Sequence, residues 1–499
     1  MQDFDAIVIG SGIGGLVAAS MLARYRKRVL VCESHTIPGG AAHSFSRRGF
    51  HFDSGPSFYC GLTDPQSFNP LRQVFDILEE SIATIPYHPL GHYHFPEGSL
   101  PIYANAKNYL DTVATFAPQG AKELQKFQQN LLVLYEALRG IPAVALRSDW
   151  QLIPVLLTRY WPSLLKLLPL IGTIAGSAGE LMDRDVRDPW VRRLIDLECF
   201  LLSGLKAHET VAPEIAFMIG ERSRSIIEYP VGGSSAIVDA LVRGLQRWGG
   251  QLRLGTHVDR ILVTSGKTTG IRLQNGEIIR APIVISNATI WDTYTKLLGD
   301  EDVPVDDRKV ALSTPAVESF MHLHLGIKAE GLEGLTGHHV VVHDSNIDIT
   351  VPGNTCMISI PTVWDQNLAP AGHHAIHAYT LEPYEGWEYG EFYQEKKRER
   401  SQSLFKALEK IIPDLRQRIV LESIGTPLTH ARFLRRYRGT YGPAIAAGKG
   451  TFPGVQTPVK GLYLVGDSTM PGIGVPAVAA SGILCANTLV NPAITAQFL

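Results

Sequence analysis

Residues 6–15 have the sequence Ala-Ile-Val-Ile-Gly-Ser-Gly-Ile-Gly-Gly, and this stretch decides the fold. The four apolar residues predict a short buried strand. Gly10, Gly12 and Gly15 then match the pattern G-x-G-x-x-G, which is informative only between a strand and a helix. Gly10 permits a tight turn, Gly12 lets the backbone approach a pyrophosphate, and Gly15 lets the helix pack on the strand.

The segments after these glycines supply the required context. Residues 16–25 predict a helix, and residues 28–32 predict a second apolar strand that ends at Glu33. The N-terminus of such a helix presents free N–H groups and a partial positive charge to phosphates. Glu33 can accept hydrogen bonds from both ribose hydroxyls of an adenosine, and its charge disfavours a 2′-phosphate. The sequence therefore predicts a dinucleotide other than NADP.

Three further stretches favour FAD over NAD. A Gly-Gly turn at residues 37–40 lets the chain pass close to a pyrophosphate and a ribityl chain. Residues 229–288 predict a helix and a layer of strands in which the backbone of Val258 can contact the adenine edge. Residues 461–465 predict a strand that places Asp467 beside a ribityl hydroxyl, and the helix that follows points its N-terminus at a flavin ring.

These stretches predict one FAD, bound non-covalently by three separated parts of the chain. The predicted cofactor-binding residues are Gly10, Gly12, Ile13, Gly14, Gly15, Glu33, Ser34, Gly39, Gly40, Ala41, Ala42, Gly55, Pro56, Val258, Asn287, Ala288, Gly466, Asp467, Gly474 and Val475.

Composition excludes several classes of function. The 499 residues carry a formal charge of −2, whereas a nucleic-acid partner requires a basic face. The five cysteines lie far apart without a C-x-x-C pair, which fits a reducing compartment and argues against a zinc or iron–sulfur site. The 17 histidines lack metal-ligand spacing, so we expect no metal. The acidic start of the chain does not resemble a signal peptide.

Three short motifs near residue 430 make the chain resemble a known family. Residues 425–430 (Gly-Thr-Pro-Leu-Thr-His), residues 432–434 (Arg-Phe-Leu) and residues 439–443 (Gly-Thr-Tyr-Gly-Pro) are similar to carotenoid isomerases. Together with the opening and closing glycine motifs, they resemble the FAD-dependent carotenoid isomerase and phytoene desaturase family. Retinol saturase is a relative, and the wider group includes the amine oxidases.

This resemblance implies the architecture. We expect an α/β protein with a discontinuous Rossmann-type FAD-binding domain at residues 1–65, 225–295 and 455–499. An α+β substrate domain, as in amine oxidases and phytoene desaturases, would take residues 66–224 and 296–454. In the family the 425–443 run lies beside the cofactor, which makes His430, Arg438 and Tyr441 the candidate catalytic residues. His430 could be a base or simply a buried core histidine.

The chain also departs from its relatives at two places. Amine oxidases carry an arginine directly after the Gly-Gly turn, where this chain has Ala41-Ala42-His43. Small residues there fit carotenoid isomerases better. Residues 55–61 differ from the isomerase pattern close to the expected ring, so the substrate and the exact reaction stay open.

Residues 150–176 form the most apolar region of the chain. Three prolines interrupt this region, and Arg159 and Lys166 lie within it, so it does not predict a spanning helix. Tryptophan, tyrosine and leucine beside basic residues suit a kinked segment that lies in a bilayer interface. A pair of core helices is the alternative.

These observations favour an FAD-dependent enzyme of carotenoid biosynthesis that isomerises or desaturates a polyene drawn from lipid. A desaturase passes a hydride to flavin N5 and a proton to a base. An isomerase with reduced flavin needs only to lower the order of a double bond and let it rotate. The alternatives are a flavin amine oxidase for a small polar substrate, a retinol saturase-like reductase, or a carotenoid carrier without turnover. We expect peripheral membrane attachment on the cytoplasmic side, at a thylakoid or plasma membrane in a photosynthetic source.

Overall fold

The computed structural model describes residues 3–499, and residues 1 and 2, which open the predicted FAD-binding domain, lie outside the described part. One sheet gathers strands from three distant stretches of the chain, in the order β19-β13-β1-β2-β9. All four strand pairs in it are parallel. Its strands are β1 (Ala6–Ile9), β2 (Val29–Cys32), β9 (Gln251–Arg253), β13 (Ile283–Ser286) and β19 (Leu462–Leu464).

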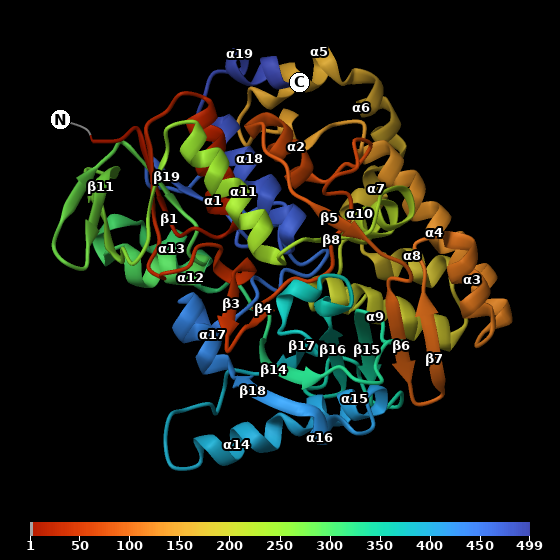
Figure 1. Cartoon of the computed structure of the whole chain (residues 1–499). Helices are drawn as coiled ribbons and strands as arrows, with labels where there is room; N and C mark the ends of the chain where they lie inside the picture. The colour runs from red at the N-terminus through yellow and green to blue at the C-terminus, as the bar shows by residue number, and fades with distance from the viewer. Residues whose placement is uncertain (1–2) are drawn as a thin grey trace.

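Three helices cover this parallel sheet: α1 (Ile13–Arg24), α11 (Ser234–Arg247) and α18 (Val475–Thr488) (Figure 1). Helix α1 is buried along almost its whole length, because the sheet lies on one side and α11 and α18 on the other. Small residues allow the close packing of α1 on α18. A Cβ added to Gly482 would lie 2.6 Å from the carbonyl oxygen of Gly14.

A three-stranded antiparallel layer adjoins the parallel sheet, as the sequence predicts. It consists of β10 (Val258–Thr264), β11 (Lys267–Leu273) and β12 (Ile278–Arg280). Asn275 and Gly276, a pair that favours tight hairpin turns, lie between the last two strands, and Gly276 has a φ of +87° that suits glycine.

A second sheet of seven strands has the order β18-β14-β17-β16-β15-β6-β7. In the view of Figure 1 it lies below the parallel sheet. Apolar runs at residues 318–325, 339–343, 355–361 and 375–380 predict four of its strands, whereas no such run indicates the hairpin of β6 and β7 or the edge strand β18. The strands are β6 (Gly91–Phe95), β7 (Gly98–Ile102), β14 (Ser319–Lys328), β15 (His338–Val342), β16 (Thr355–Ser359), β17 (His373–Glu382) and β18 (Ile419–Gly425).

Helices cover both ends of this second sheet. Those beside β6 and β7 are α3 (Ala106–Ala114), α4 (Pro118–Leu138), α8 (Ala178–Asp185), α9 (Pro189–Ser203) and α10 (Ala212–Arg224). Those at the other end are α14 (Tyr393–Arg400), α15 (Gln402–Ile411), α16 (Leu415–Arg418) and α17 (Pro427–Leu434). Other helices lie away from this sheet: α2 (Pro70–Leu78) and α19 (Pro492–Thr495) pack on the core around α1, and α12 (Ile290–Asp292) and α13 (Val305–Leu312) pack beside β10. The charged run at residues 395–400 predicts a single helix as far as residue 412, where the structure has α14 and α15. The Ser401 hydroxyl donates to the Arg398 carbonyl at the break between them.

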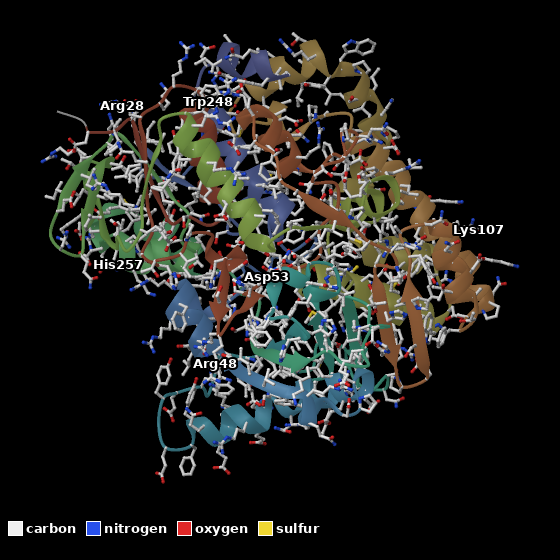
Figure 2. All side chains as sticks on the ribbon, in the orientation of Figure 1. Arg28, Arg48, Asp53, Lys107, Trp248 and His257 are labelled. Atoms are coloured by element: carbon white, nitrogen blue, oxygen red, sulfur yellow. The ribbon has the colours of Figure 1, made fainter. Side chains whose placement is uncertain are left out.

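Asp53 connects the parts of the chain that meet at the centre of the molecule (Figure 2). It ends β4 (Phe50–Asp53), which pairs with β3 (Ser44–Arg47). Its carboxylate accepts from the Tyr229 hydroxyl at 2.7 Å, from Ser44 Oγ at 2.7 Å and from the Ser234 backbone at 2.9 Å. Tyr229 lies in β8 (Glu228–Pro230), which pairs with β5 (Thr84–Pro86). Burial raises the pKa of Asp53.

The apolar region at residues 150–176 folds as α5 (Leu152–Arg159), α6 (Trp161–Leu167) and α7 (Ile171–Ala175). None of these three helices buries a residue, which contradicts the alternative of two core helices. Among residues 3–499, no helix is long and apolar enough to cross a bilayer. The domain boundaries given above stay a prediction.

Candidate cofactor and substrate site

The glycine loop packs against two other segments so closely that side chains are excluded. Gly10 has a φ of +92°, which favours glycine. A Cβ on Gly15 would lie 2.4 Å from the Gly10 carbonyl oxygen, and one on Gly14 would lie 2.8 Å from the Gly466 nitrogen. The start of α1 and the end of β19 therefore meet at the loop.

Glu33, which is 8% exposed, holds this loop to the end of β2. Its Oε2 accepts from the Ser11 backbone N–H at 2.8 Å and from the Ser11 hydroxyl at 2.7 Å. Its Oε1 accepts from the His35 backbone N–H at 2.7 Å and from the Ser34 hydroxyl at 3.3 Å. A carboxylate offers about four lone-pair positions, so a ribose hydroxyl would take the place of the Ser34 hydroxyl, the most distant of these donors.

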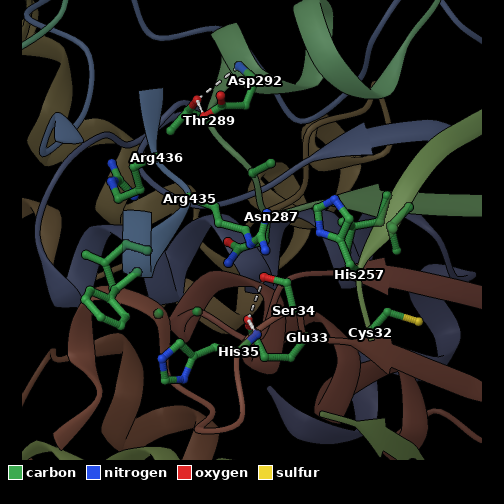
Figure 3. A pocket seen from close by; sticks show the side chains of 18 of the residues that line it. Cys32, Glu33, Ser34, His35, His257, Asn287, Thr289, Asp292, Arg435 and Arg436 are labelled. Atoms are coloured by element: carbon green, nitrogen blue, oxygen red, sulfur yellow. Dashed lines mark hydrogen bonds between the residues drawn. The ribbon is translucent and has the colours of Figure 1, made fainter. Parts of the chain in front are cut away.

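A cleft of about 630 Å³ runs from Glu33 past the glycine loop. Figure 3 shows Glu33, Ser34 and His35 on one side of it, and Thr289 and Asp292 on the other. Nine predicted cofactor-binding residues line this dinucleotide cleft, namely Gly10, Gly12, Glu33, Ser34, Gly40, Ala41, Val258, Asn287 and Ala288.

A second cavity of about 260 Å³ continues from the dinucleotide cleft, and Gly12, Ala41, Asn287 and Arg436 line both. We call it the ring cavity. Ten further predicted residues line it: Ile13, Gly14, Gly39, Ala42, Gly55, Pro56, Gly466, Asp467, Gly474 and Val475. Gly15 lines neither space, because it packs on Gly10.

The two connected spaces fit FAD. Gly12 lies where the backbone would approach the diphosphate. A side chain does not fit there, because a Cβ on Gly12 would lie 2.5 Å from Asn287 Nδ2. The adenosine end would lie at Glu33 and the ribityl chain near Asp467. Gly474, at the N-terminus of α18, would bring the helix dipole to the ring. FAD supplies the redox chemistry when it is bound. The individual contacts with FAD stay predictions.

Tyr441 is the predicted catalytic residue that lines the ring cavity. Its hydroxyl lies 3.4 Å from His322 Nε2, and His322 Nδ1 lies 2.9 Å from His377 Nε2. His430 lies behind this row and stacks on His322 with 4.3 Å between ring centroids. His430 lines a further cavity of about 240 Å³, which adjoins the dinucleotide cleft because His35, His43 and Phe433 line both.

Burial keeps these histidines neutral. It lowers the pKa of His430 to about 3 and that of His324 to about 4, and it holds those of His322 and His377 well below the usual value. A neutral His430 can orient its neighbours, but it is a weak base near neutral pH.

Replacing His430 with glutamine tests this neutrality. An unfolded histidine titrates near pH 6.5 and the folded one near 3. Between these values the unfolded state binds more protons, so stability falls as the pH drops below about 6.5, by about 1.4 kcal/mol per unit for one histidine. We expect H430Q to lower the slope of the unfolding free energy against pH by about 1.4 kcal/mol per pH unit in this range. Urea denaturation at several pH values measures the slope. A slope equal to that of the original protein would contradict the assignment.

Arg438 is the predicted catalytic residue that lies apart from the others. It is half exposed, pairs with Glu385 and lines none of the three spaces described so far. Arg436, two residues earlier, instead lines both the dinucleotide cleft and the ring cavity and pairs with Asp467. Proximity in the sequence could identify the arginine-rich segment, but it could not say which guanidinium faces inward.

A further apolar cavity of about 190 Å³ adjoins the ring cavity, and Leu201, Leu202, Met357 and Tyr379 line both. Sequence reasoning missed its walls, which come from α9, α10, β15 and β16 and carry no local motif. A buried ion pair lies on its wall, with Arg222 2.6 Å from Glu198. Tyr109 donates to the same carboxylate at 3.0 Å.

A dinucleotide cleft that leads to a helix N-terminus beside an apolar cavity defines a flavin-dependent oxidoreductase. Residues 13–490 match the family model described as flavin containing amine oxidoreductase. The chain therefore belongs to the flavin-containing amine oxidoreductase family, and its cofactor is FAD. Residues 3–499 contain no group of three or more histidine, cysteine or acidic side chains placed to hold a metal.

Curated relatives confirm the resemblance found in the motifs. The chain is 37% identical over 497 residues to prolycopene isomerase 2 of an Oncidium hybrid cultivar, covering 97% of this chain and 84% of that protein. Prolycopene isomerase of Arabidopsis thaliana is 35% identical, with 97% and 82% covered. A neurosporene-forming phytoene desaturase of Rhodobacter capsulatus is 28% identical, with 97% and 93% covered.

Solved structures confirm the fold class. A putrescine oxidase has a TM-score of 0.63 at 14% identity, with 98% of both chains covered. An oxidoreductase from Methanosarcina mazei has a TM-score of 0.61 at 21% identity, with 96% of this chain and 98% of that chain covered.

Proposed function

We propose that the chain is an FAD-dependent enzyme that acts on a carotenoid or a related polyene, and that it isomerises a double bond in preference to desaturating the chain. The apolar cavity that continues from the ring cavity carries this proposal. Leu201, Leu202 and Met357 line the passage between the two, so a long, extended apolar substrate can reach from the ring into the second cavity.

The carboxylates of these two cavities argue against an amine substrate. An ammonium that is held by an ion pair needs a free anion, but Glu198 is paired with Arg222 and Asp467 with Arg436. An amine oxidase for small polar substrates is therefore disfavoured, although the fold alone would permit it.

The ring cavity also favours isomerisation over desaturation. Desaturation removes a hydride and a proton, so a base must accept the proton. The ionisable residues on its walls are Arg436, Asp467, Tyr379 and Tyr441, of which the first two pair with each other. Burial raises the pKa of both tyrosines, so their hydroxyls stay protonated and cannot serve as the base. The prolycopene isomerases, more similar to the chain than the phytoene desaturases, support the same choice.

We further propose peripheral attachment to a membrane from its cytoplasmic side, through α5–α7. Exposed fractions of 75% for Trp150, 60% for Ile153, 56% for Trp161 and 58% for Leu168 leave a large apolar surface in water. Leu170, Ile174 and Met218 pack against the same buried core, α7 contacts α10, and Met218 of α10 lines the apolar cavity. The surface thus lies one helix away from the proposed substrate path.

Anaerobic incubation in liposomes tests the reaction. FAD-loaded protein is mixed with several carotenoids, with the flavin either oxidised or reduced beforehand. The products are separated by chromatography, and their masses are measured by mass spectrometry. We expect turnover only with reduced flavin, and products of unchanged mass. Loss of two hydrogens would establish desaturation. Peroxide from amines in a parallel incubation under air, without any change in a polyene, would overturn the proposal.

A further inference from the structure

Arg435 projects into the dinucleotide cleft without a partner. It follows α17 and lines the cleft, and Figure 3 shows its side chain directed towards Asn287. Its neighbours Arg436 and Arg438 each pair with a carboxylate. Within residues 3–499, Arg435 forms no ion pair and no side-chain hydrogen bond, and it is exposed to the solvent of the cleft.

The backbone conformation at Arg435 favours glycine over arginine. It ends α17 with φ and ψ of +51° and +35°, the left-handed conformation in which glycine is strongly preferred. A side chain there costs free energy, and such strained positions gather at functional sites. The fold therefore gives no local reason for an arginine.

Arg435 faces the part of the cleft where a diphosphate is expected. It points towards Asn287, which lies against Gly12: a Cβ on Gly12 would be 2.5 Å from Asn287 Nδ2. Gly12 directly precedes α1, whose first N–H groups are free to bind phosphate. The Gly-Gly turn and the residues Ala41 and Ala42 after it bring no positive charge to this region.

The other basic groups nearby are already engaged or neutral. Lys296 Nζ lies 2.7 Å from Asp292 Oδ1. Burial, followed by the nearby charge of Arg435, lowers the pKa of His257, which is therefore neutral at pH 7. Arg432 also lines the cleft without an ion pair, but its guanidinium lies over the ring of Phe433, 5.5 Å from the centroid. Within residues 3–499, Arg435 is thus a guanidinium of this wall with neither an ionic nor an aromatic partner, and a guanidinium suits phosphate oxygens.

We propose that Arg435 binds the diphosphate of FAD, so that the segment after α17 closes over the cofactor from the side opposite the glycine loop. This assignment concerns cofactor binding and does not depend on which substrate the enzyme uses.

The replacement of Arg435 with glycine tests the proposal, because it removes the charge and relieves the backbone together. We expect apo protein with R435G to bind FAD about tenfold more weakly in a flavin-fluorescence titration. The same variant is expected to melt at the same or a higher temperature without FAD. R435K is expected to recover part of the affinity.

Arg48 provides the matched control. It lies in the turn between β3 and β4 (Figure 2), is exposed, and has a φ of +49°. R48G relieves the same backbone conformation away from the cleft, so its FAD affinity is expected to equal that of the original protein.

Competition with ADP and riboflavin identifies the contacted group. If Arg435 holds the diphosphate, R435G lowers the affinity for ADP by a similar factor and leaves the affinity for riboflavin unchanged. Unaltered FAD and ADP affinity, a loss confined to riboflavin, or a lower melting temperature of the apo protein would each overturn the proposal.

Discussion

Replacing Glu33 with alanine is expected to weaken FAD binding at least about 100-fold. The change removes the acceptor predicted for the ribose hydroxyls and leaves the backbone N–H groups of Ser11 and His35 without their partner. Each lost charge-assisted bond is worth about 1.5–3 kcal/mol, and two of them together suffice for a factor of about 100. Fluorescence titration of the apo protein with FAD measures the change.

Two further variants define what Glu33 contributes. Glu33→Gln keeps the volume but turns either a donor or a weaker acceptor towards Ser11, so we expect an intermediate loss of affinity. Glu277 is an exposed acid that pairs with Arg253 3.1 Å away, and E277A should leave FAD affinity unchanged. Stoichiometric FAD in purified E33A, held as tightly as in the original protein, would disprove the role.

Placing three aspartates on α5 and α6 is expected to abolish binding to lipid vesicles. Leu157, Trp161 and Leu165 are 59%, 56% and 55% exposed, so each can bury further apolar area in a bilayer. Burying the exposed half of one such side chain in the bilayer contributes about 1 kcal/mol to membrane binding. Three aspartates in place of these side chains remove this contribution and add the cost of bringing charges to the bilayer. Vesicle binding should fall at least about 100-fold in sedimentation assays, while the melting temperature stays close to the original.

Helix α13 offers the control for this experiment. Val305 and Val310 are 78% and 71% exposed on a separate part of the surface, where two aspartates should leave vesicle binding unchanged. Arg159 and Lys166 lie within the apolar region, so anionic vesicles should bind more tightly than neutral ones at low salt. Equal sedimentation of the triple variant and the original protein would refute membrane contact through α5–α7.

The nucleotide-binding part of the fold could be predicted because its determinants are local. A strand, a glycine turn and a helix N-terminus occupy consecutive positions, and parallel strands end at one edge of their sheet. Glu33, Asn287 and Asp467 each follow such a strand, and all three line the connected cavities. Gly15 belongs to the same motif, but it lines neither cavity and contributes through its packing on Gly10.

The substrate side could not be predicted in the same way, because its contacts join distant residues. His322 and His377 meet through the pairing of β14 and β17, whose register no short motif encodes. Leu201 and Met357 share a cavity wall although they lie on a helix and a strand far apart in the chain. Which arginine of the segment after α17 turns inward likewise depends on the backbone conformation at Arg435.

The assembly of the parallel sheet sets the order of events during biosynthesis. β1 and the glycine loop leave the ribosome early, but β19 and α18, which complete their surroundings, are translated hundreds of residues later. A nascent chain that lacks them exposes the apolar face of α1, a state that chaperones shield from aggregation. FAD can therefore be incorporated only after translation has passed α18, and a ribosome stalled before that helix would carry a colourless polypeptide.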